Sequence, residues 1–379
     1  MTRKVSAVNK IALLATGDEL INGDILNTNA QEIARRLFAL GMHPGMHLIT
    51  ADTTSDLEQA IHFLLTTHRA LIITGGLGPT SDDLTRFALS NATNLPLVFD
   101  EPTWDIIVAR LKHFGYDSPP VSNRQQALFP KGATIIQNPN GTASGCMLNH
   151  NDQLIFMLPG PPMECLPMVT KVVLPTLKDA GFQHIEFYKS WLLFGVSEGQ
   201  IAEELDNIAK PHDCVTGYRL AYPYIEFKIF SNVQHAFEIV LPQLETNIKP
   251  YLIGNGTQTA SEQLRNLLPT LNKPIHICDL ATGGLLETTL KTPKTFNQLE
   301  FTSTVTDHHD ILITGLDEFW QSKDVTQTQL SIEFNFSSKQ NKVSTTIPFR
   351  GDRVKHYAVE FICWKVLDFL TNEFLRPVI

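Results

Sequence analysis

The stretch "ALIITGGLGPTSDDLTRFAL", residues 70–89, decides the predicted fold of the N-terminal part of this chain. It begins with an apolar, β-branched run and continues into three glycines and a proline, followed at once by Asp82 and Asp83. Glycines lack the Cβ atoms that keep a ligand away from the backbone, so such a loop can present main-chain N–H groups to phosphate oxygens. The two acids would repel a bare phosphate, and they therefore indicate a divalent cation beside the ligand.

The segments around this stretch predict a parallel, doubly wound α/β sheet. Short apolar runs typical of buried strands alternate with segments of helical spacing, and Ser55 is the expected N-cap of the second helix. The expected strands are residues 10–16, 45–50 and 70–74, and the expected helices are residues 29–41 and 55–68. Alternation of this kind places helices on both faces of a parallel sheet.

The sequence pattern changes twice further along the chain. Residues 1–175 keep the α/β alternation, whereas residues 176–252 predict a small α+β unit of strand, helix and strand. Residues 253–379 begin and end with a predicted helix. We therefore expect three domains with these boundaries.

Composition narrows the functional classes. Hydrophobic residues make up 43% of the 379 residues and charged residues 18%, which is enough apolar surface for packed cores. The net charge of −9 without a basic run argues against a nucleic-acid partner. No apolar run is long enough to span a membrane, and the first ten residues lack the apolar segment of a signal peptide. We expect a cytoplasmic protein with five reduced, structural cysteines.

Acidic residues follow each of the first three predicted strands. Glu19 follows the first, Asp52 the second, and Asp82 and Asp83 the third. Because ligands bind beyond the carboxyl ends of strands in open parallel sheets, these acids can meet at one edge. Asp52, Asp82 and Asp83 are candidate metal ligands, and Glu19 is a candidate general base. An alternative stays open, in which Asp82 and Asp83 only cap the following helix.

Two more loops hold glycine and proline where predicted strands end. They are "NPNGTASG", residues 138–145, and "LPGPPMEC", residues 158–165, in which Thr142 and Glu164 could face a ligand. Ordinary turns explain the glycines and prolines equally well.

Six motifs in this order resemble the N-terminal domain of the CinA family, which is itself similar to molybdopterin-binding proteins. The motifs are "GDELINGDILNTNAQEIARRL", "ADTTSDL", "ITGGLGPTSDDLT", "NRQQALFP", "NPNGTASG" and "LPGPPMEC". The resemblance covers nearly all of residues 10–170. It implies a molybdopterin-binding-like α/β fold and hydrolysis of ADP-ribose to AMP and ribose 5-phosphate with a divalent metal such as Mg²⁺, Co²⁺ or Mn²⁺.

The same resemblance implies the site residues. The substrate-binding positions would be Asn29, Thr74, Gly75, Gly76, Gly78, Pro79, Thr80, Asn140, Gly141, Thr142 and Gly160. The catalytic positions would be Glu19, Asp52 and Asp83, and the metal ligands Asp52, Asp82 and Asp83. One departure is Phe87, which stands where the family usually has an acid.

The rest of the chain resembles the other two domains of the family. Residues 176–252 resemble its KH-like linker domain but lack the GxxG loop and basic neighbours that an RNA-binding KH domain needs, which favours a spacer or dimerisation role. Residues 253–379 resemble its nicotinamide mononucleotide deamidase domain, in which a serine is the nucleophile. Leu280 in "DLATGG" replaces that serine and cannot attack a carbonyl, so we expect the deamidase activity to be lost.

These observations favour a hydrolase of a small nucleotide pyrophosphate that forms a homo-oligomer, most simply a dimer. One alternative is a protein of the same fold that binds a molybdopterin or a nucleotide without cleaving it. Another is a degenerate homologue that persists as an oligomeric partner.

Overall fold

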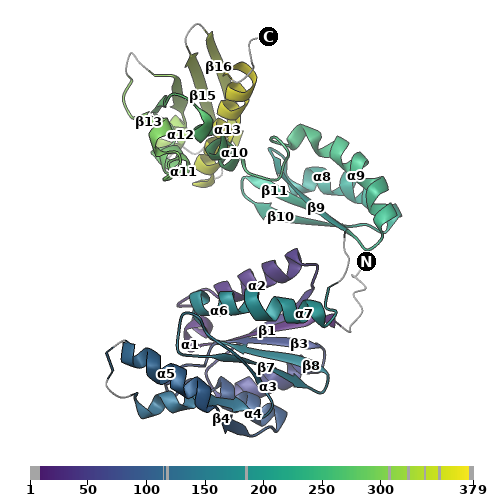
Figure 1. The fold of residues 1–379 in the computed structure, drawn as a ribbon. Coiled ribbons are helices and arrows are strands. Elements are labelled where there is room, and N and C mark those ends of the chain that lie inside the picture. Colours follow the sequence, from purple (N-terminus) through teal and green to yellow (C-terminus); the bar gives the residue numbers. More distant parts are fainter. Residues whose placement is uncertain are drawn as a thin grey trace. The chain divides into compact units, whose positions relative to one another are not determined.

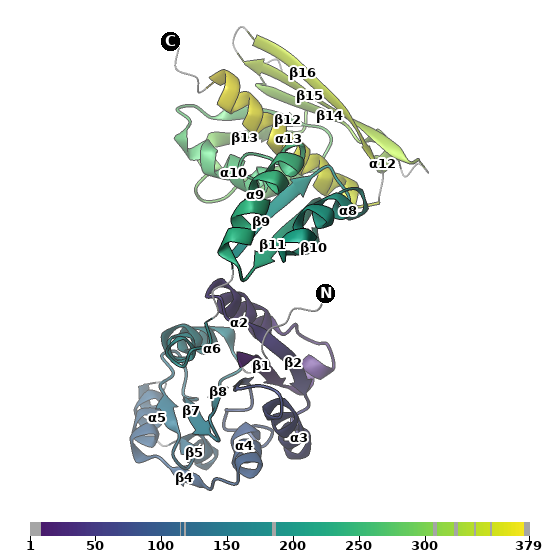
Figure 2. The same cartoon turned by 90° about the vertical axis from the view of Figure 1, so that its right-hand side faces the viewer.

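The structure is a computed structural model, and it describes residues 9–374 apart from 114, 117–118, 184–186, 306–308, 322–324, 337–338 and 349–350. The chain divides into two compact units, residues 1–185 and 186–379 (Figures 1 and 2). The second unit therefore contains most of the segment predicted as the middle domain together with the C-terminal segment.

The first unit is built on a six-stranded sheet with the order β2-β1-β3-β8-β7-β6. Its strands are β1 (Ile11–Thr16), β2 (Pro44–Thr50), β3 (Ala70–Thr74), β6 (Thr134–Ile136), β7 (Gly145–His150) and β8 (Gln153–Leu158). β1 pairs in parallel with β2 and β3, and β3 pairs in parallel with β8, which confirms the predicted parallel core. β7 runs antiparallel to β8, because Asn151 and Asp152 join the two strands in a tight turn with φ of 51° and 61°.

Helices cover both faces of this sheet (Figure 1). They are α1 (Asp18–Ile21), α2 (Thr28–Ala39), α3 (Thr54–Leu65), α4 (Thr85–Thr93), α5 (Glu101–His113), α6 (Pro162–Met168) and α7 (Leu174–Asp179), with a 3₁₀ segment at Val121–Ala127 and a small ladder of β4 (Leu97–Phe99) and β5 (Leu128–Pro130). Thr53, not the predicted Ser55, caps α3, because the Thr53 hydroxyl accepts the amide proton of Asp56 at 3.3 Å.

Two hydrophobic cores lie on the two faces of the sheet. Leu71 and Ile73 of β3 pack with residues of α3 and α4, whereas Ala70 and Ile72 of the same strand pack with residues of α2, α6 and α7. All five residues of β3 are buried, as expected for a parallel strand covered by helices on both sides. This arrangement fixes where the strand ends and the glycine loop begins.

The second unit contains two sheets. The three-stranded antiparallel sheet has the order β10-β11-β9 and carries α8 and α9, and the five-stranded sheet has the order β13-β12-β14-β15-β16 (Figure 2). The elements of the first are β9 (Phe187–Phe194), α8 (Glu198–Ala209), β10 (Val215–Ala221), β11 (Tyr224–Ser231) and α9 (Gln234–Ile248). Those of the second are α10 (Ala260–Leu267), β12 (Ile275–Asp279), α11 (Leu285–Leu290), β13 (Leu299–Thr302), β14 (Ile311–Gly315), α12 (Asp317–Trp320), β15 (Gln327–Phe336), β16 (Lys339–Pro348) and α13 (Arg353–Phe369).

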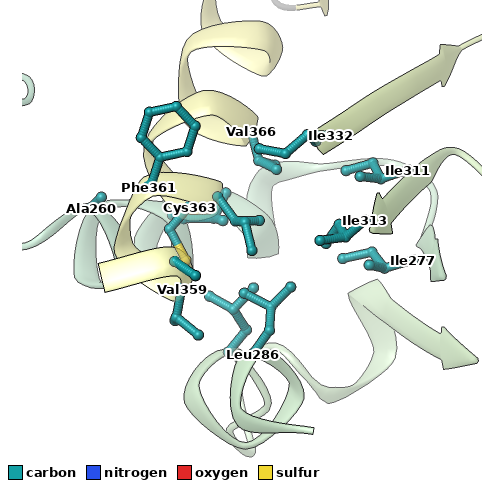
Figure 3. Close-up of a cluster of buried hydrophobic side chains, with 14 of the residues drawn as sticks. Ala260, Ile277, Leu286, Ile311, Ile313, Ile332, Val359, Phe361, Cys363 and Val366 are labelled. Carbon is teal, nitrogen blue, oxygen red and sulfur yellow. The ribbon is translucent and has the colours of Figure 1, made fainter. Parts of the chain in front are cut away.

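The core of this unit joins the two sheets. Val359 and Cys363 of α13 lie close to Leu286 of α11 and face the isoleucines of β12 and β14 (Figure 3). Tyr224 of β11 belongs to the same buried cluster, and its hydroxyl donates a hydrogen bond to the buried Glu360 carboxylate at 2.7 Å. The amide of Ala260 donates to the Tyr224 oxygen at 2.8 Å. These buried bonds link the two predicted segments into one unit.

All five cysteines are buried and free. Within the described part of the chain, none of the helices combines the length and the apolar character that crossing a membrane requires.

Candidate active site

A cavity of about 380 Å³ opens at the carboxyl ends of β1, β3 and β8. The helices that follow β1 and β3, α2 and α4, pack on opposite faces of the sheet, and such a point in a doubly wound sheet is where ligands bind. The predicted residues that line the cavity are Glu19, Asp52, Gly75, Gly76, Gly78, Pro79, Asp82, Asp83, Thr142 and Gly160. The predicted residues that do not line it are Asn29, Thr74, Thr80, Asn140 and Gly141.

The loop after β3 needs its glycines for steric reasons. Gly76 has a φ of +64°, and a Cβ atom there would lie 2.2 Å from the Thr85 hydroxyl oxygen. A Cβ atom at Gly78 would lie 2.4 Å from a carboxylate oxygen of Asp83. A side chain at Gly76 would therefore press against Thr85 of α4, and one at Gly78 would displace the Asp83 carboxylate.

Within the described residues, the loop leaves two neighbouring amides without a protein acceptor. The Thr85 hydroxyl donates to the carbonyl of Gly75 at 2.8 Å, and the Thr85 amide donates to that of Gly76 at 3.3 Å. Because C=O and N–H point in opposite directions across a trans peptide, the amides of Gly76 and Leu77 point away from Thr85. Neither amide donates a hydrogen bond within the described residues. Two adjacent free N–H groups are suited to bind an anionic oxygen.

Asp83 holds the next part of the loop. Its carboxylate accepts the amide of Gly78 at 2.6 Å, and the amide and hydroxyl of Thr80 at 2.8 and 2.6 Å. α4 begins after Leu84 and has no side-chain cap, so the alternative in which the acids cap this helix is wrong. The amides of Gly78 and Thr80 are therefore already occupied, unlike those of Gly76 and Leu77.

Arg86 is a residue of this site that sequence reasoning missed. It is fully buried, and its Nη2 donates to the carbonyl of Leu77 at 2.7 Å. The N–H of the same peptide unit belongs to Gly78 and donates to Asp83, so this one peptide is held between a guanidinium and a carboxylate. Burial lowers the pKa of Arg86 to about 10, and the group stays charged at neutral pH. The signal available in the sequence was its spacing, three residues before the buried Leu89 on the apolar face of α4.

Asp52 is fixed from two sides at the rim of the cavity. One carboxylate oxygen accepts the Thr16 hydroxyl at 2.5 Å, and the other accepts the amide of Asp18 at 3.2 Å. The amide of Asp52 in turn donates to the Asp18 carboxylate at 3.2 Å. These bonds tie the ends of β1 and β2 together and hold the Asp52 carboxylate at the cavity.

The cavity is acidic. Five of its lining residues are carboxylates, namely Glu19, Asp52, Asp82, Asp83 and Glu164, and none of its described lining residues is a lysine or an arginine. The predicted triad Asp52, Asp82 and Asp83 does not form a ready set of ligands, since no three His, Cys, Asp or Glu side chains in the described part of the chain are grouped closely enough to hold a metal ion. The physical reason is that Asp52 is held by Thr16 and Asp18 at the end of β1, whereas Asp83 is held by the amides of its own loop.

The loop before β7 is shaped by Asn138. Its buried side-chain oxygen accepts the amides of Asn140 and Gly141, both at 2.9 Å, and its Nδ2 donates to Glu164 at 2.6 Å. The predicted ligand contacts at Asn140 and Gly141 therefore lack free amides, whereas Thr142 reaches the cavity. The sequence showed Asn138 only as part of a turn motif.

In the second unit, the "DLATGG" segment forms a tight turn after β12. The Asp279 carboxylate accepts the amides of Ala281 and Thr282 at 3.0 and 2.9 Å, and Trp320 donates from its indole nitrogen to the carbonyl of Ala281 at 2.7 Å. The Leu280 side chain is exposed, so the turn presents a hydrocarbon side chain at this position.

Residues 12–179 match the sequence family described as "Probable molybdopterin binding domain". A CinA-like protein of Geobacter sulfurreducens is 32% identical over 285 residues, with 73% of this chain and 69% of that protein covered. A CinA-like protein of Geotalea uraniireducens is 32% identical over 294 residues, with 73% and 68% covered. A crystal structure of the protein CinA from Thermoplasma acidophilum is 26% identical and covers 46% of this chain and 99% of that chain, with a TM-score of 0.42.

The N-terminal unit is thus an α/β domain of the molybdopterin-binding class, with its cavity at the carboxyl edge of the sheet. The chain belongs to the CinA-like family, which confirms the family predicted from the six ordered motifs.

Proposed function

We propose that the first unit hydrolyses a nucleotide pyrophosphate, with ADP-ribose giving AMP and ribose 5-phosphate. The observation that carries this proposal is the combination of two free adjacent amides, those of Gly76 and Leu77, with five carboxylates in one cavity. The amides suit anionic oxygens, and the carboxylates oppose them unless a cation is present. A pyrophosphate that arrives with a divalent ion satisfies both requirements.

The donor set fits a hard divalent ion shared with the substrate. Mg²⁺ is usually bound through one or two carboxylates together with substrate phosphates and water, so the absence of a three-ligand group among the described side chains is compatible with it. Asp52 and Asp82 would hold the ion. Asp83 would stabilise the loop instead, because its carboxylate already accepts three hydrogen bonds from it. When bound, such an ion neutralises phosphate charge and lowers the pKa of a coordinated water.

The chain's own residues would then position and deprotonate the nucleophile. The Gly76 and Leu77 amides would bind the oxygens of one phosphate. The Glu19 carboxylate, which lines the same cavity, would accept the proton of the attacking water as the water oxygen bonds to phosphorus and the bridging P–O bond breaks. The leaving phosphate carries away the electron pair of that bond.

Chromatography of reaction mixtures tests this proposal. Wild-type protein with ADP-ribose and Mg²⁺ should release AMP, and a chelator should stop the release. Glu19→Gln should slow the release at least about 100-fold, as expected for loss of a general base, without changing the melting temperature. Absence of AMP with Mg²⁺, Mn²⁺ and Co²⁺ alike would overturn the proposal.

A second candidate function is binding without hydrolysis, which the absence of a three-ligand metal group among the described residues favours. In that case calorimetry would detect a bound nucleotide or pterin while the chromatogram shows no product.

For the second unit we propose that the deamidase chemistry has been lost. Leu280 offers no nucleophilic atom at the turn after β12, so nicotinamide mononucleotide should release no ammonia. Enzyme-coupled detection of ammonia checks this, and a positive result that survives purification would contradict it.

A further inference from the structure

The 3₁₀ segment Val121–Ala127 contacts the glycine loop that follows β3. It carries most of the motif "NRQQALFP", which has no role in the proposed reaction. β5 follows the segment directly and pairs with β4, and Phe129 of β5 is buried in the same core cluster as Leu77 of the loop. The β4–β5 ladder and this shared core therefore fix the segment beside the loop.

Gln125 donates from one nitrogen atom to two carbonyls of the loop. Its Nε2 lies 3.1 Å from the carbonyl oxygen of Gly78 and 2.8 Å from that of Thr80. An amide NH₂ group has two protons, so these two bonds use its full donor capacity. Among the described residues, Gln125 is the only donor to the carbonyl of Gly78.

Gln126 supplies a donor to the carbonyl one residue earlier in the loop. Its Nε2 lies 3.4 Å from the carbonyl oxygen of Leu77, which also accepts a hydrogen bond from Arg86. The buried Asn123 donates from Nδ2 to Oε1 of Gln126 at 2.9 Å, and this bond fixes which end of the Gln126 amide faces the loop. The two glutamines therefore donate to three carbonyls of one loop.

These bonds complete the pairing of the loop carbonyls. Thr85 donates to the carbonyls of Gly75 and Gly76, and those of Leu77 and Gly78 accept from the side chains described above. The free main-chain groups beside the cavity are therefore N–H groups. A carbonyl oxygen that turned toward the cavity would present a partial negative charge and repel a phosphate oxygen.

Gln125 influences the cavity only through the loop. Gly78, Pro79 and Gln126 line the cavity, whereas Gln125 does not. The Gly78 and Thr80 carbonyls are thus directed at a side chain outside the cavity.

We propose that Gln125 is a positioning residue for the anion site formed by the Gly76 and Leu77 amides. By holding the Gly78 and Thr80 carbonyls away from the cavity, it keeps the wall beside these amides free of negative oxygen atoms. This inference rests on the proposed function and goes beyond it, because it makes a residue outside the cavity responsible for the sign of the charge that the loop accepts.

Two substitutions at Gln125 test the proposal by calorimetric titration of pyrophosphate with Mg²⁺. Gln125→Met keeps the length and neutrality of the side chain but removes both donors, and should weaken binding about tenfold. Gln125→Glu replaces the donors with an ionised carboxylate that can only accept, so the two carbonyls lose their partner and are also repelled. At about pH 8 this variant should bind pyrophosphate at least about 100-fold more weakly than wild type.

A pH series separates positioning from packing. Protonation returns one O–H donor to the introduced carboxyl group, so the deficit of Gln125→Glu relative to wild type should shrink between about pH 8 and about pH 5. The ratio of Gln125→Met to wild type should stay constant, because methionine does not titrate. Comparing ratios also removes the effect of protonation of pyrophosphate itself.

Arg124→Gln is the matched control for a change of charge in the same segment. Arg124 is exposed, and its guanidinium lies over the Phe99 ring at 4.6 Å from the ring centroid. Pyrophosphate affinity in this variant should stay within about twofold of wild type, since charges at exposed sites are screened by salt. Thermal melts should show all three variants within a few degrees of wild type, because the loop can open locally while the core stays folded.

The outcomes distinguish this inference from the proposed function. Wild-type affinity in Gln125→Met and Gln125→Glu would overturn the role of Gln125 while leaving the anion site intact. An equal deficit in both variants at every pH would also overturn it, because the side chain would then only pack against the loop. Failure of the wild-type protein to bind pyrophosphate at all would refute the anion site itself, and with it both the proposed function and this inference.

Discussion

Asp83→Asn is the substitution that most directly tests how the glycine loop is held. The wild-type carboxylate accepts three hydrogen bonds, from the amide of Gly78 and from the amide and hydroxyl of Thr80. An asparagine has one acceptor oxygen, so its NH₂ group must face one of the two backbone N–H groups. The variant therefore leaves at least one amide unpaired and removes the charge from the remaining bonds.

The size of the effect follows from these bonds. Hydrogen bonds to a charged group contribute about 1.5–3 kcal/mol, so losing one lowers the closed-to-open equilibrium constant of the loop by about 10- to 150-fold. Ligand affinity should fall by up to the same factor, since the free amides of Gly76 and Leu77 belong to the same loop. The melting temperature should fall by at most a few degrees, because a loop can open locally while the core stays folded.

The assay is calorimetric titration of pyrophosphate with Mg²⁺, paired with a thermal melt of each protein. Asp82→Asn is the matched control, because Asp82 is the exposed neighbour and is assigned to the ion. That variant should raise the Mg²⁺ concentration needed for half-maximal binding without weakening the loop. Wild-type affinity in Asp83→Asn would refute the reasoning that this carboxylate holds the loop in its binding conformation.

Three further predictions concern the same unit. Arg86→Met removes a buried charge, two of whose nitrogens have no partner among the described residues, so it should change the unfolding free energy in urea by less than about 1 kcal/mol while ligand affinity falls about tenfold. Arg86→Lys should restore part of that affinity, and a large loss of stability in Arg86→Met would contradict this account. Gly76→Ala should destabilise the loop by about 1–3 kcal/mol and abolish pyrophosphate binding in the calorimeter, whereas Gly160→Ala, whose added Cβ would make an ordinary 3.6 Å contact, should leave the melting temperature unchanged. Burial lowers the pKa of His68, whose ring accepts a hydrogen bond from the amide of Met46 at 3.1 Å, so the unfolded state binds the proton more readily than the folded state. The contribution of the neutral ring to the free energy of unfolding is therefore full above about pH 6.5 and is lost as the pH falls below it. Urea titrations from pH 7.5 to 5 should show a steeper decline in the free energy of unfolding for wild type than for His68→Gln.

The parallel core of the first unit could be predicted because its signals are local. The apolar run at residues 70–74 is a strand with the predicted bounds, since β-branched residues buried on both faces favour that state. The direction of β7 was not predictable in the same way. It depends on the two-residue turn at Asn151 and Asp152, whose left-handed backbone was not distinguished from an ordinary loop.

The location of the site was predictable, but the hydrogen bonds within it were not. Acids after successive parallel strands must meet at one sheet edge, and Glu19, Asp52, Asp82 and Asp83 do line one cavity. The role of each acid depends on which backbone amides its carboxylate reaches, and the spacing of the acids in the sequence carries no information about these contacts. Arg86 was overlooked because a charged residue is normally assigned to the surface.

The hydrogen bonds of Tyr224 have a consequence for how the second unit unfolds. With the phenol held by Glu360 on one side and by the amide of Ala260 on the other, neither sheet can loosen without stranding a polar group in hydrocarbon. A protein truncated at the predicted boundary between residues 252 and 253 should therefore be less stable than the intact second unit. Both sheets should unfold in a single transition, and a fragment that ends at residue 252 would expose the hydrophobic surface that the other sheet covers in the intact unit.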